Sequence, residues 1–148
     1  MKDLQNTQLL QNISSLLDNA RKKVAVAVNQ TIVLTYYEIG RMIVEDEQNG
    51  ENRAEYGKAV FKDLSLHLTD KRFGRGFSVE NLDRMRFFYK TYSEQISLTL
   101  LTKSSNIIQQ TTSVNFNLSW SHYLKLMRIK DPNERKFYEI ENRILLTF

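Results

Sequence analysis

The segment from Leu9 to Glu47 contains no proline, and its first glycine is Gly40. A run of this length without a break is too long for one β-strand, since strands rarely exceed about ten residues. Its first part also places apolar residues at three- and four-residue steps, which is the spacing of an amphipathic helix. We therefore predict helix throughout, and we expect residues 24–44, which are apolar on nearly all sides, to be central in the fold. Glu38 and Arg41 lie one turn apart and are expected to form an ion pair.

Apolar spacing and capping residues predict further helices along the chain. Gly50 follows the first helical segment and is expected to stop it, and another helix fits residues 56–69. Ser78 and Ser119 each suit the N-cap of a following helix, because a serine hydroxyl can accept a free backbone N–H. A last helix is expected to start at Asp131–Pro132, with an acceptor at the N-cap and proline at the first helical position.

Residues 93–118 differ in character and predict a β-hairpin. Ser, Thr, Asn and Gln dominate there and alternate with apolar residues, a pattern typical of strands, with the turn expected around Lys103–Asn106. The predicted elements follow the order of a winged helix-turn-helix: a helix, a glycine-containing turn, a capped helix and a polar hairpin. The expected fold class is mainly α, with a winged helix-turn-helix-like core and a small β-hairpin. We expect one domain over 1–148, divided into N-terminal helices (1–52), the core with its hairpin (53–118) and C-terminal helices (119–148).

Positive charge is concentrated in the second part of the chain. Residues 1–52 carry 5 basic and 7 acidic side chains, whereas residues 53–148 carry 16 basic and 10 acidic ones. This asymmetry favours contact with a polyanion such as DNA, although a solvated surface with a modest lysine excess also fits it. The basic turn at 70–77 and the helix after it hold cations for phosphates and side chains able to read base edges. The predicted DNA-binding residues are Lys71, Arg72, Arg75, Ser78, Asn81, Arg84 and Lys90.

Phe87, on the same helix, favours a different class of function. It points away from the predicted core face of Leu82, Met85 and Tyr89. Phe88 flanks it, and a recognition helix seldom exposes two phenylalanines. A second hypothesis therefore stays open: a protein-interaction or dimerisation module that contacts its own copy or a nuclease partner without touching DNA.

Enzymatic chemistry finds little support in the sequence. Cysteine is absent, which excludes a thiolate nucleophile. The two histidines lie far apart in the sequence, and this spacing argues against a zinc site. The one glutamate-x-lysine motif, Glu134–Lys136, belongs to a predicted helix, whereas a nuclease site typically places it on a strand. Ser121 and His122 are adjacent, so they point in different directions, and no orienting acid is evident. We expect no enzyme activity, no metal and no cofactor.

Trp120 is expected to anchor the C-terminal helices. Its ring would be buried against the helix at residues 56–68, and its indole N–H would then require an acceptor. His122 is expected to be a structural residue, because no acid is available to orient it as a base. The chain has no apolar run long enough for a bilayer and no signal-peptide core, so we expect a cytoplasmic protein.

An ordered set of short segments resembles a known family over about residues 9–141. The segments are Tyr36–Arg41, Tyr56–Lys58, Gly76–Ser78, Asn81–Leu82, Met85–Tyr89, Leu118–Tyr123 and Arg135–Tyr138. Together they resemble the N-terminal domain of the YhcG-like family of bacterial proteins. The resemblance implies a winged helix-turn-helix domain, followed in relatives by a C-terminal nuclease domain of the PD-(D/E)xK type. Because the present sequence stops before that nuclease domain, we expect a stand-alone or truncated N-terminal domain that binds double-stranded DNA, as a homo-oligomer or beside a nuclease partner.

Overall fold

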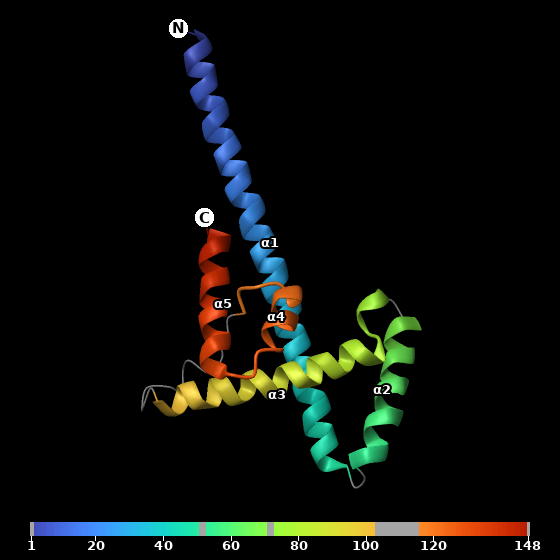
Figure 1. The fold of residues 1–148 in the computed structure, drawn as a ribbon. Helices are drawn as coiled ribbons and strands as arrows, with labels where there is room; N and C mark the ends of the chain where they lie inside the picture. Colours follow the sequence, from blue (N-terminus) through green and yellow to red (C-terminus); the bar gives the residue numbers. More distant parts are fainter. Residues whose placement is uncertain (1, 51–52, 71–72, 103–115, 148) are drawn as a thin grey trace.

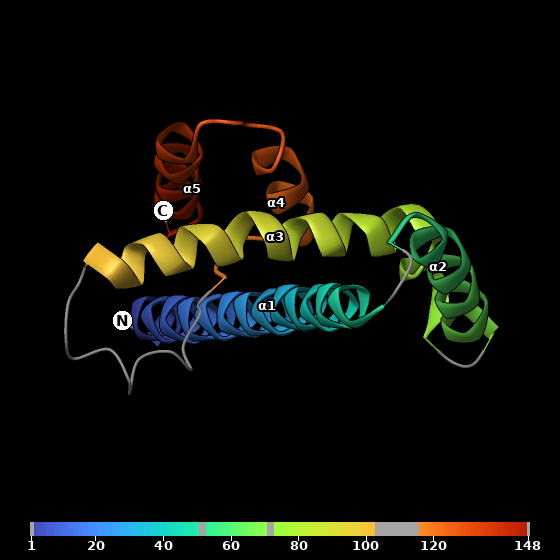
Figure 2. The same ribbon diagram turned by 90° about the horizontal axis from the view of Figure 1, so that it is seen from below.

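The computed structural model describes residues 2–50, 53–70, 73–102 and 116–147, and every regular element in them is helical. In chain order these elements are α1 (Lys2–Asn49), α2 (Arg53–Asp70), the short 3-10 helix η1 (Gly74–Gly76), α3 (Val79–Thr102), α4 (Trp120–Leu126) and α5 (Pro132–Thr147). Helix α3 crosses α1 and lies between α1 and the pair α4 and α5 (Figures 1 and 2). The prediction of a mainly α fold is therefore confirmed. None of the described helices combines the length and the apolar character needed to cross a bilayer.

The predicted β-hairpin is wrong. The described residues contain no strand, and residues 93–102 continue α3 as helix, so the winged core that required a hairpin is not supported. The predicted turn at Lys103–Asn106 lies outside the described residues. Residues 93–102 are helical because helix formation is cooperative. Extending an existing helix adds one hydrogen bond per residue without a new nucleation cost. Helix α3 is already held in place by Tyr92, which is buried, and the alternating pattern beyond it does not end the helix.

At Gly40 the backbones of α1 and α3 come too close to leave room for a side chain. A β-carbon added there would overlap the carbonyl oxygen of Met85 and lie 2.8 Å from its carbonyl carbon. Two apolar clusters flank this crossing. The larger consists of Val33, Tyr37, Phe88, Tyr92, Phe116, Leu118, Tyr123, Leu126 and Met127. The smaller consists of Ile43, Leu82 and Met85. Leu82 and Met85 therefore face the core as predicted.

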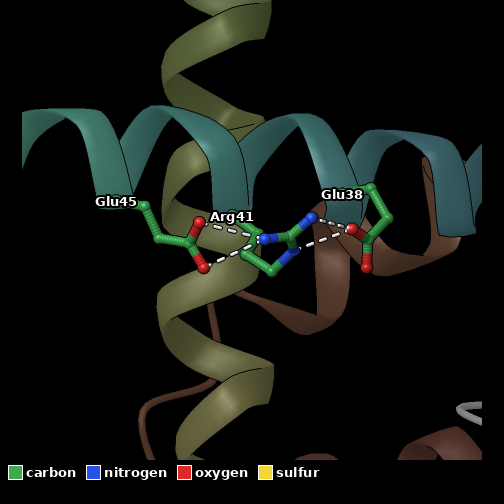
Figure 3. A network of polar contacts seen from close by, with 3 residues as sticks. All are labelled: Glu38, Arg41 and Glu45. Carbon is green, nitrogen blue, oxygen red and sulfur yellow. Dashed lines mark hydrogen bonds and ion pairs between the residues drawn. The ribbon is translucent and has the colours of Figure 1, made fainter. Parts of the chain in front are cut away.

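Two arginines of the crossing helices are neutralised by carboxylates. Arg86 of α3 donates to both oxygens of Glu47 on α1 at 2.7 and 2.8 Å, and this hydrogen bonding raises the pKa of Arg86. Arg41 lies between Glu38 and Glu45, with donor–acceptor distances of 2.7 and 3.0 Å (Figure 3). The predicted pair of Glu38 and Arg41 is confirmed. Because their charges are already compensated, neither arginine is a good candidate for binding a phosphate.

The helix boundaries follow the predicted capping residues. The Ser78 hydroxyl accepts the Asn81 N–H at 3.1 Å, and the Ser119 hydroxyl accepts the His122 N–H at 3.4 Å. Asp131 accepts the backbone N–H of Asn133 at 2.9 Å, directly before α5. Helix α1 ends at Asn49, one residue before the predicted stop at Gly50.

The N-terminal half of α1 extends away from the other helices (Figure 1). Residues 6–28 are all exposed, and from residue 6 onward the first buried residue of α1 is Val33. The expectation that residues 24–44 are central therefore holds only for the later part of that range. Helical apolar spacing creates a face that can be buried, but burial also needs a second surface, and the α1 residues in the two apolar clusters begin at Val33.

Candidate nucleic-acid interface

Two of the residues predicted to bind DNA, Ser78 and Asn81, have partners within the protein. Ser78 caps α3, as described above. The Asn81 side-chain amide donates to the carbonyl oxygen of Gly76, and its oxygen accepts the Trp120 indole N–H at 3.3 Å. Asn81 therefore connects η1, α3 and α4, and both its amide nitrogen and its amide oxygen form a hydrogen bond within the fold.

Three other predicted residues are exposed cations. Arg75 lies on η1, while Arg84 and Lys90 lie on α3. Lys90 follows Arg84 by six positions, and at 100° per residue this places them about 120° apart around the helix. The structure therefore does not bring Arg84 and Lys90 onto one face. Lys71 and Arg72 lie outside the described residues.

Arg84 instead belongs to a pocket between α3 and the end of α4, with a volume of about 680 Å³. We call this site the basic pocket. Its lining consists of Arg84 and Phe87 from α3, Leu124 from α4, and Met127, Arg128 and Lys130 from the segment that follows. It therefore combines an apolar wall with three cationic side chains.

Among the residues that the structure describes, no carboxylate lines the basic pocket. In the part of the chain that the structure describes, Arg84, Arg128 and Lys130 form no ion pair, in contrast to Arg41 and Arg86. Like charges gathered at a concave surface create a positive potential that attracts anions such as phosphate. The basic pocket is consequently the best candidate for a nucleic-acid contact among the described residues.

Sequence reasoning did not select Arg128 and Lys130 as site residues. They are brought to Arg84 because α4 packs through Tyr123 and Leu126 onto the larger apolar cluster, which includes Phe88 of α3. A signal was present, since cations alternate with apolar residues over Met127–Lys130. Whether these cations can belong to a binding site depends on which helix α4 packs against. That packing joins parts of the chain that are far apart in sequence, so the alternation alone does not predict it.

Ser119 and His122 form a second polar contact, at the start of α4. The Ser119 hydroxyl lies 2.5 Å from the Nδ1 atom of His122 and also accepts the His122 backbone N–H. Both contacts fit the expected structural role of His122 as part of a helix cap. Among the described residues, no group of three or more acidic or histidine side chains is placed to hold a metal ion.

Comparisons with known proteins give one family and one relative. Residues 12–144 match the family described as "DUF1016 N-terminal domain". The protein named "Putative nuclease YhcG" from Escherichia coli (strain K12) is 37% identical to this chain, over 90% of the chain and 40% of that protein. The chain thus spans less than half the length of this relative. No solved structure gives a significant match.

Proposed function

This chain belongs to the DUF1016 N-terminal domain family, as its resemblance to YhcG-like proteins indicated, and we propose that it is a non-catalytic module that binds double-stranded DNA. The observation that carries the proposal is the basic pocket, which Arg84, Arg128 and Lys130 line with no carboxylate from the described part of the chain. A relative named as a nuclease fits a role on nucleic acid. We assign binding and no bond cleavage to this chain, because its only glutamate-x-lysine motif, Glu134–Lys136, lies in α5 and not on a strand.

Phosphate neutralisation accounts for the proposed affinity. Each cation that contacts a DNA phosphate releases condensed counterions, and this release favours binding without reading the base sequence. Arg75, exposed on η1, and Lys90, exposed on α3, add positive charge outside the basic pocket. The interface is therefore expected to bind duplexes of different sequence with similar affinity.

A salt series on random duplex DNA tests this proposal. Three phosphate contacts predict an affinity that falls roughly 40-fold between 50 and 200 mM salt, from a slope of about 0.9 per contact. Arg84→Ala should weaken binding and reduce the slope by about one contact. Lys22→Ala, which removes an exposed cation from the outer half of α1, is the matched control and should change neither quantity. A salt-independent affinity, or equal effects of the two variants, would contradict the proposal.

A second candidate function is self-association through the outer half of α1. A row of exposed residues there follows alternating three- and four-residue steps, the spacing of a coiled-coil seam. The row consists of Leu10, Ile13, Leu17, Ala20, Val24 and Ala27. Leu10 and Val24 are 65% and 63% exposed, so a second copy laid along this seam would remove a large apolar surface from water.

Sedimentation at micromolar concentration tests this second candidate. We expect a dimer, and we expect Leu17→Asp to shift it to monomer, because a carboxylate in the seam would lose its water on association. Ser15→Asp is the control, since Ser15 is exposed on the opposite side of α1 and introduces the same charge. A wild-type monomer, or dissociation by both variants, would exclude the seam as the interface.

A further inference from the structure

Phe87 stands in an unusual environment for a phenylalanine. The residue is 50% exposed, whereas the adjacent Phe88 is fully buried in the larger apolar cluster. Among the described aromatic residues, Phe87 is absent from the ring–ring contacts that link Phe88 to its neighbours. Phe87 instead lines the basic pocket, beside Leu124 and Met127. An apolar ring in this position adds nothing to the attraction of a phosphate, so the cations alone do not explain it.

A half-exposed aromatic residue that lines the same pocket as three cations matches one ligand chemistry well. Proteins that hold single-stranded nucleic acid place bases on aromatic rings and neutralise the adjacent phosphates with Lys and Arg. In an intact duplex the base faces are stacked on one another, so a phenyl ring beside the backbone has no base face to contact. A volume of about 680 Å³ lies within the range of small-molecule sites and leaves room for a base with its sugar and phosphate.

We infer that the basic pocket holds an unpaired nucleobase stacked on Phe87, with Arg84, Arg128 and Lys130 contacting the phosphates on either side of it. This inference rests on the proposed function and deepens it, since it adds a preference for unpaired DNA to a surface that also contacts duplexes. The apolar side chains of Leu124 and Met127 form the rest of the wall around the stacked base. Binding at this pocket therefore depends on both charge and the aromatic face.

Paired binding measurements on the full chain test the inference, using a labelled single strand of about 20 nucleotides and the duplex of the same length. Phe87→Leu keeps an apolar side chain of similar size but removes the aromatic face. We expect it to weaken single-strand binding roughly 5- to 140-fold, the range of one stacked base, while the duplex affinity changes less than about 2-fold. Phe87→Tyr restores an aromatic face and should restore single-strand affinity. Thermal unfolding of both variants is expected to match the wild type, because the ring is half exposed.

The outcomes separate this inference from the function on which it rests. Unchanged single-strand affinity in Phe87→Leu, or an equal loss on single strand and duplex, would overturn the stacking role. Salt-dependent duplex binding could still persist in that case, and the proposed function would stand. Absence of binding to both DNA forms by the wild-type chain would overturn the proposed function, and the inference with it.

Discussion

Gly40→Ala is expected to lower the free energy of unfolding by about 3 kcal/mol or more, at the upper end of overpacking effects. The new β-carbon would overlap the Met85 carbonyl oxygen, which is a backbone atom of α3 and cannot move away by a side-chain rotation. The two helices would have to separate, and the apolar clusters on both sides of the crossing would loosen together. Chemical denaturation followed by circular dichroism measures this change.

The direction of the stability change in Gly40→Ala distinguishes a close helix crossing from an isolated helix. In a helix without a close neighbour, replacing glycine by alanine stabilises by about 1 kcal/mol, because alanine has the higher helix propensity. Gln48→Ala, at an exposed position of the same helix, is the control and should change stability by less than about 0.5 kcal/mol. A Gly40→Ala protein as stable as the wild type would show that α1 and α3 do not cross at this close distance.

Trp120→Ala is expected to cost about 3 kcal/mol, the lower end of the range for large aromatic residues, since Trp120 is only partly buried. Its ring makes edge-to-face contacts with Tyr36 of α1 and Phe88 of α3, at centroid distances of 5.0 and 5.1 Å. It packs against both apolar clusters and so connects α4 to the helix crossing. The sequence predicts that the ring lies against residues 56–68. Its ring–ring contacts and its hydrogen bond are made with α1 and α3, while Phe61, Leu64 and Leu68 of α2 pack, like Trp120, against the smaller apolar cluster.

Two further variants separate the contributions to the loss of stability in Trp120→Ala. Trp120→Phe keeps an aromatic ring but removes the N–H donated to Asn81, so it should cost about 1 kcal/mol. His122→Ala, two residues later in α4, should cost less than Trp120→Ala because the Ser119 cap is retained. Thermal or chemical denaturation measures all three. A stability for Trp120→Ala within error of that for His122→Ala would contradict the anchoring role.

The basic pocket shows why the candidate site could be predicted only in part. Arg84 was selected from the sequence because it lies on the outward face of a capped helix. Arg128 and Lys130 were not, because their contribution depends on α4 packing onto α3. Phe87 was recognised as outward-facing, but its place beside three cations became visible only with the neighbouring element in position.

The sequence by itself determined the local features of the helices. Ser78, Ser119 and Asp131 start helices as predicted, because a cap hydrogen bond joins residues close together in the chain. The face of α3 formed by Leu82 and Met85 was likewise predictable, because helical geometry places apolar residues by their spacing alone.

Only the tertiary structure decided which of these surfaces are covered and where helices continue. Residues 93–102 alternate like a strand, yet they extend a helix that is held by packing of its earlier residues. Val24 and Val33 look equally suited to a core in the sequence, yet Val24 is 63% exposed and Val33 is fully buried. The difference arises because burial requires a second surface. Val33 packs in the apolar cluster that α1 shares with α3, whereas residues 6–28 of α1 are exposed.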